Sequence, residues 1–165
     1  MKNENGSRLL DKFLKGLLVL VVCAVLLTGC TGEKNVEGSL EEIMTKLYAD
    51  VPEENRPMML GNMEVTEENV EGFLGTSDIE YKEALASESM VGAIAHSVVL
   101  VRTKENANVE DVKKQIEENV NPRKWVCVGV EKEDVIIKSK GDLIVVIIVE
   151  DTDVRTKIDN SFGNL

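Results

Sequence analysis

The last third of the chain contains three apolar segments, rich in β-branched residues, with almost no sequence between them. They span 125–131, 134–138 and 142–149, and turn signals at Lys132-Glu133 and Lys140-Gly141-Asp142 separate them. Two to four residues are enough for an antiparallel hairpin, whereas a parallel pair of strands needs a crossover of a dozen residues or more. The three segments therefore predict an antiparallel sheet. The last of them is the most apolar and is predicted to lie at the sheet centre.

Two further strands are predicted upstream, at 79–86 and 97–103. The second contains four successive apolar residues, which indicates a strand covered on both faces or at least a central one. Residues 56–65 are rich in methionine and irregular, with room for one short strand. Residues 87–95 fit a turn, a helix or a continuation of the strand before them.

Four amphipathic segments predict helices, and three of them begin at a residue that caps free backbone amides. The first begins with the capping box Ser39-x-x-Glu42, and the next two begin after Thr66 and Asn108. Gly75 suits the left-handed turn that ends the second helix. The predicted helical ranges are 39–48, 67–74, 109–120 and 151–162.

The order of these elements predicts the fold class. After residue 75 it is strand, strand, helix, three strands and helix, so strand and helix do not alternate throughout as they do in doubly wound α/β proteins. We predict an α+β domain over residues 39–165, with an antiparallel sheet of four or five strands and helices packed against it, after an N-terminal signal peptide. A chain of this size suits one domain with a hydrophobic core.

The N-terminus has the features of a secretory signal. Four basic residues precede an eleven-residue apolar run at 17–27, which ends in Leu27-Thr28-Gly29-Cys30; the basic residues are Lys2, Arg8, Lys12 and Lys15. The alternative, a transmembrane helix, needs about 20 apolar residues, and this run is too short.

The Leu-Thr-Gly-Cys sequence resembles the lipobox of bacterial lipoproteins. The resemblance implies cleavage of residues 1–29, a diacylglycerol thioether on Cys30, and attachment to the outer face of the cell membrane. Two acyl chains hold a protein stably, whereas one holds it only marginally. Residues 30–38 then form the lipidated cysteine and a short polar tether that reaches at most about 28 Å.

Charge and cysteine content restrict the partners of the mature chain. Removing residues 1–29 takes away four of 19 basic and two of 30 acidic side chains, which leaves 15 and 28 and a formal charge of −13. Such a charge disfavours nucleic acid, whose binding needs clustered cations. Cys23 leaves with the signal and Cys30 carries lipid, so Cys127 has no partner for an internal disulfide. We expect no metal and no cofactor, because the residues of a structural zinc site and a phosphate-binding loop are missing.

Few residues of this chain could combine as a catalytic nucleophile and its base. His96 is the single histidine, so the nucleophilic pairs that can be drawn are His96 with Ser97 and His96 with Cys127. Cys127 is predicted to lie in a valine-rich strand, where a thiol more often serves as a small buried hydrophobe. We therefore expect a protein that is not an enzyme, and a cryptic hydrolase that uses His96 is the remote alternative.

A candidate ligand surface surrounds Arg123, Lys124 and Trp125, where two cations adjoin the single tryptophan. His96 and Arg102 join this candidate site if their strand adjoins the one predicted at 125–131. The alternative, which we favour, is that Trp125 is part of the core and that the two cations are solvated at a turn.

The methionines at 58, 59 and 63 also allow two interpretations. Flexible methionine side chains can line an adaptable binding surface or an extracellular copper site, or they can fill gaps in a core.

From about Ser39 onward the chain resembles a family of uncharacterised lipoproteins from Gram-positive, Clostridia-type bacteria, catalogued as a domain of unknown function. The resemblance implies a cell envelope with one membrane and supplies no catalytic residue. The segments that carry it are 95–102 (AHSVVLVR), 121–128 (NPRKWVCV) and 141–144 (GDLI).

These observations predict a membrane-anchored extracytoplasmic lipoprotein that acts as a non-catalytic binding or accessory module. Its partner would be a protein or a small ligand, and the membrane would be held through Cys30. A structural subunit of an envelope complex is the main alternative.

Overall fold

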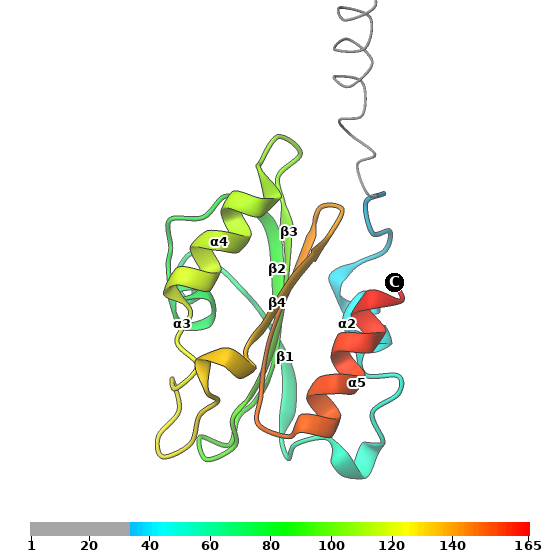
Figure 1. Cartoon of the computed structure of the whole chain (residues 1–165), viewed down its shortest axis with the longest axis vertical. Helices are drawn as coiled ribbons and strands as arrows, with labels where there is room; N and C mark the ends of the chain where they lie inside the picture. The colour runs from blue at the N-terminus through cyan, green and yellow to red at the C-terminus, as the bar shows by residue number, and fades with distance from the viewer. Residues whose placement is uncertain (1–33) are drawn as a thin grey trace, which may run out of the picture. The chain divides into compact units, whose positions relative to one another are not determined.

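Five antiparallel strands form the centre of the molecule, and helices cover both faces of the sheet (Figure 1). The computed structural model describes residues 34–165, which make one compact unit. The predicted signal, Cys30 and the first residues of the tether lie outside the described residues. The strand order is β1-β2-β3-β5-β4, and the strands are β1 (Leu60–Glu64), β2 (Tyr81–Ser89), β3 (His96–Thr103), β4 (Ile136–Lys140) and β5 (Leu143–Val149).

The predicted α+β class with an antiparallel sheet is confirmed. Four α-helices and two short 3-10 helices accompany the strands in the described part of the chain. The helices are α2 (Leu40–Leu47), η1 (Glu53–Asn55), α3 (Val70–Leu74), α4 (Val109–Asn119), η2 (Lys132–Asp134) and α5 (Thr152–Gly163).

Strands β3 and β5 are buried along their whole length, because the sheet lies between two helical layers. Successive side chains of a strand point to opposite faces. In β3, Val98 and Leu100 therefore pack with α2 and α5, whereas Val99 and Val101 pack with α3 and α4. The apolar run at 143–149 lies inside the sheet as predicted, but the central position belongs to β3.

The helix starts follow the local rules. Ser39 and Glu42 form the predicted capping box, with two side-chain to backbone hydrogen bonds of 3.2 Å. The Asn108 and Asp151 side chains cap α4 and α5. The predicted cap at Thr66 is wrong. Helix α3 begins at Val70 without a side-chain cap, because the Asn69 side chain accepts the Thr66 N–H at 2.8 Å and holds residues 66–69 in a separate turn.

Gly75 ends α3 in the predicted left-handed conformation, with φ of +79°. A Cβ atom added there would lie 2.0 Å from the Asn119 carbonyl oxygen, so the glycine also permits close contact between α3 and the end of α4.

The predicted strand at 125–131 is wrong. Residues 120–131, the α4–η2 loop, are irregular, and Cys127 has a φ of +113°, far outside the β region. The loop closes on itself, since the Val130 N–H donates to the Pro122 carbonyl at 2.9 Å. Tertiary packing here overrides the β-propensity of the valines. Strand β4 is consequently an edge strand of the described sheet, where it pairs with β5, and it starts two residues later than predicted.

Candidate functional site

The two ends of the sheet differ in what they carry. We call one the tether end, where β3 ends at Thr103 and β5 begins at Leu143. Residues 34–38, the tether segment, run past this end. We call the other the methionine end: β1 begins there at Leu60, and β2 turns into β3 between Ser89 and His96.

The five residues predicted to form a ligand surface are not brought together. His96 and Arg102 point toward α2 and the tether segment, whereas Lys124 lies on the opposite face, beside Ser97. His96 and Arg102 share a face but stand at opposite ends of β3. The prediction that they adjoin Lys124 depended on a strand at 125–131 that does not exist.

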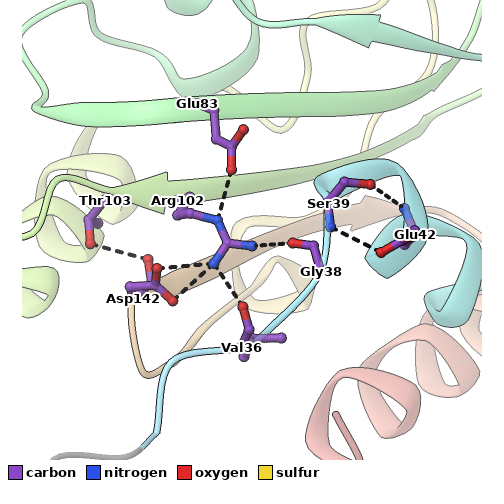
Figure 2. A network of polar contacts seen from close by, with 8 residues as sticks. All are labelled: Val36, Gly38, Ser39, Glu42, Glu83, Arg102, Thr103 and Asp142. Carbon is purple, nitrogen blue, oxygen red and sulfur yellow. Dashed lines mark hydrogen bonds and ion pairs between the residues drawn. The ribbon is translucent and has the colours of Figure 1, made fainter.

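Arg102 is a buried cation with several protein partners (Figure 2). Its side chain is 9 % exposed and pairs with the carboxylates of Glu83 at 2.8 Å and Asp142 at 3.0 Å. The same guanidinium donates to the carbonyl oxygens of Val36 at 2.8 Å and Gly38 at 2.9 Å. These contacts use all three of its nitrogens, so its role in this conformation is to hold the tether segment rather than a ligand.

His96 is buried and makes a hydrogen bond of 2.6 Å with the hydroxyl of Tyr48, at the end of α2. Burial lowers the pKa of His96 to about 4, although Asp151 opposes this shift. Burial also raises the pKa of the Tyr48 hydroxyl. The tyrosine therefore keeps its proton and the imidazole is neutral, so the hydrogen bond joins two uncharged groups. Ser97 points to the other face of the sheet, and Cys127 is exposed in the loop on that face, so neither forms the nucleophilic pair considered from the sequence.

Lys124 is less exposed than predicted. Its side chain is 16 % exposed, and its ammonium group lies 2.6 Å from a Glu88 carboxylate oxygen. The same group stands 4.5 Å from the ring centre of Phe73 and 5.2 Å from that of Trp125. Burial lowers the pKa of Lys124, and Glu88 opposes the shift. This contact fastens the α4–η2 loop to β2.

Trp125 and Arg123 behave as the favoured interpretation predicts. Trp125 is partly buried and packs against the core between the sheet and α3 and α4. Its buried indole N–H has no hydrogen-bond partner among residues 34–165. Arg123 is exposed and pairs with Glu131.

The large apolar side chains that stand exposed in residues 34–165 gather at the methionine end. They are Met58, Met59, Met90 and Val126, between 63 % and 76 % exposed. The Met90 N–H donates to the Met59 carbonyl at 3.1 Å, and the Ser89 hydroxyl donates to the Met58 carbonyl at 2.9 Å. Val126 lies in the α4–η2 loop, which reaches the same end through the contact of Lys124 with Glu88. In Figure 1 this loop (yellow) and the β2–β3 connection (green) lie together at the bottom.

The three methionines named from the sequence differ in burial. Met63 packs against the core and fills a gap, whereas Met58 and Met59 are exposed. Met59 also has a φ of +53°, a left-handed conformation that is rare for a bulky residue. Sequence reasoning missed Met90 and Val126, because the first lies in a segment left open and the second in a segment predicted as strand.

A pocket of about 340 Å³ lies next to the methionines, between α2 and β1. Its wall includes Leu60, Tyr48 and Ser87, and Arg56 borders it while donating to the backbone carbonyls of Val51 and Tyr48. A larger pocket of about 570 Å³ lies along the first half of β2, with a charged lining that includes Glu64, Lys82 and Lys104.

No group of three His, Cys, Asp or Glu residues in the described part of the chain is arranged to hold a metal ion. Among residues 34–165 no helix combines the length and the apolar character that crossing a bilayer requires. Comparison with known proteins finds no matching family model, no similar curated protein and no similar solved structure.

Proposed function

We propose that this chain is a lipid-anchored extracytoplasmic module that binds a protein partner through its methionine end. The observation that carries the proposal is the separation of two features: the tether segment runs past one end of the sheet, and the exposed methionines lie at the other. A binding surface placed in this way points away from the membrane.

The chemistry of the methionine end suits a protein partner. Apolar patches that remain exposed often mark interaction sites, and unbranched thioether side chains adapt to irregular surfaces. The adjacent pocket of about 340 Å³ has room for a side chain of the partner. Since the mature chain carries a formal charge of −13, a partner with basic residues around an apolar centre would fit best.

Lipid anchoring is supported by the sequence of the N-terminus. The basic residues, the short apolar run and Leu27-Thr28-Gly29-Cys30 together resemble a lipoprotein signal. Attachment through Cys30 would place the domain on the outer face of the cell membrane. There it would act as a binding or accessory module, or as a subunit of an envelope complex.

Site-specific photo-crosslinking in intact cells tests the binding surface. A photoreactive residue at Met59 should crosslink to a discrete protein, and the same residue at Glu117, exposed on α4, should not. Met58→Ser with Met90→Ser should weaken the Met59 crosslink at least tenfold without unfolding the domain, because both side chains are exposed. Equal crosslinking at both positions, or a crosslink that survives the double substitution, would argue against the proposal. A single stoichiometric product would favour the structural subunit over a transient binding module.

A further inference from the structure

The tether segment, residues 34–38, is part of the folded domain rather than a free linker. Arg102 donates from two nitrogens to the carbonyl oxygens of Val36 and Gly38, at 2.8 and 2.9 Å. Figure 2 shows Val36 and Gly38 of this segment beside the guanidinium, with Glu83 and Asp142 on its other sides. The charge of Arg102 is thus balanced by two carboxylates while its remaining donors hold the backbone.

Two further contacts fix the same segment. Val36 is partly buried against the core formed by α2 and α5. At the turn between β4 and β5, a Cβ on Gly141 would lie 2.6 Å from the Lys34 carbonyl oxygen and 2.8 Å from the Cα of Asn35. Residue 39 then begins the capping box of α2. The described chain from Lys34 onward therefore has contacts along its length and little slack.

Because residues 34–38 are fixed, the free connection between Cys30 and the domain is short. Three residues separate Cys30 from Lys34, and four Cα–Cα steps span at most about 15 Å. The headgroup layer alone is about 5–8 Å thick. If residues 34–38 were free, the reach from Cys30 to the first fixed residue would be about 30 Å, twice as large.

We propose that the tether end is a membrane-contacting surface, held against lipid headgroups by this short connection. This inference rests on the proposed lipid anchor at Cys30. The contact comes from the covalent connection and not from charge, because an acidic chain is repelled by anionic lipid. The surface comprises residues 34–35, the β4–β5 turn and the exposed residues 104–106 that follow β3. The eight residues of β3 span roughly 26 Å, so the methionine end stands about that far from the membrane.

Energy transfer from single labels to the membrane tests this orientation. The full-length chain is expressed in a Gram-positive host, with Cys127→Ser to remove the remaining thiol. It carries either Asn106→Cys at the tether end or Ala93→Cys at the methionine end, both of which are exposed positions. The labelled protein is placed in vesicles of phosphatidylglycerol and phosphatidylethanolamine that contain a headgroup-linked acceptor. We expect transfer from position 106 to be at least threefold more efficient than from position 93.

Two variants test whether the short connection and the Arg102 contacts cause the orientation. Inserting twelve Gly and Ser residues between Glu33 and Lys34 leaves the Arg102 contacts intact and adds a flexible linker of roughly 20 Å. Transfer from position 106 should then fall toward the value for position 93. Arg102→Met should reduce the difference in the same direction, and the insertion variant keeps the test valid if that substitution unfolds the domain.

The outcomes distinguish the two proposals. Mass spectrometry of the same preparation shows whether Cys30 carries lipid; if it does not, the anchor and the orientation both fail. If Cys30 is lipidated and the two labels transfer equally, or the insertion changes neither value, the orientation is wrong and the anchor stands.

Discussion

Arg102 carries the densest set of polar contacts at the residue scale. Its guanidinium is nearly buried, so removing it leaves Glu83 and Asp142 without their partner and frees the tether segment. Breaking a buried ion pair from one side costs about 3–5 kcal/mol, and partial exposure of both carboxylates reduces this. We expect Arg102→Met to lower the free energy of unfolding by about 2–4 kcal/mol in chemical denaturation.

Glu83→Gln is the matched control for that substitution. The Glu83 side chain is 48 % exposed, so its pair with Arg102 is screened by water. Its loss should cost about 1 kcal/mol or less. Equal losses for the two variants would show that Arg102 acts through its pair with Glu83 alone and does not hold the tether segment.

His96 makes folding stability depend on pH. Its folded pKa of about 4 lies below its ordinary value of 6.5. Between pH 4 and pH 6.5, His96 is therefore protonated in the unfolded chain and neutral in the folded chain. Stability from this group is therefore complete above pH 6.5 and is lost as the pH falls toward 4, by up to about 3 kcal/mol. His96→Gln should remove this part of the slope, while the titrating carboxylates affect both proteins. Parallel stability curves for the two proteins would contradict the buried, neutral histidine.

At the scale of elements, the α4–η2 loop depends on one internal ion pair. Lys124 and Glu88 have side chains that are both 16 % exposed, and they join the loop to β2. Lys124→Met leaves the Glu88 carboxylate poorly solvated and should cost about 2–4 kcal/mol. Adding Glu88→Gln should recover at least half of that loss. If the double variant is as unstable as the single one, the cost arises from packing around Phe73 and Trp125 and not from an unpaired charge.

Most elements were predictable because their signals are local. The capping box at Ser39, the cap at Asn108 and the glycine at residue 75 act within a few residues, and the structure contains all three. The α4–η2 loop was not predictable in this way. Its valines have high β-propensity, and long-range contacts place the segment as a loop over the sheet. They include the pair of Lys124 with Glu88, 36 residues apart, and the packing of Trp125 against the core.

At the scale of the whole molecule, the sequence predicts the class of the fold but not its functional surfaces. Short turns between strands require antiparallel pairing, and this argument needs no long-range information. Arg102 binds Val36 and Gly38 in the tether segment, 66 and 64 positions away in the sequence. At the methionine end, Ser89 binds Met58, 31 positions away. No spacing in the sequence reveals such contacts. The predicted ligand site therefore combined His96 and Arg102, on one face of the sheet, with Trp125, on the other.

The proposed binding surface and membrane orientation both depend on attachment of the chain to the outer face of the membrane through Cys30. The most direct measurement is the intact mass of the protein extracted from membranes of a Gram-positive host, compared with its Cys30→Ser variant. We predict a mature chain that begins at Cys30 and carries a diacylglyceryl group, and a variant that is neither lipidated nor cleaved before residue 30. A wild-type chain that retains residues 1–29, or that begins at Cys30 without lipid, would contradict the account.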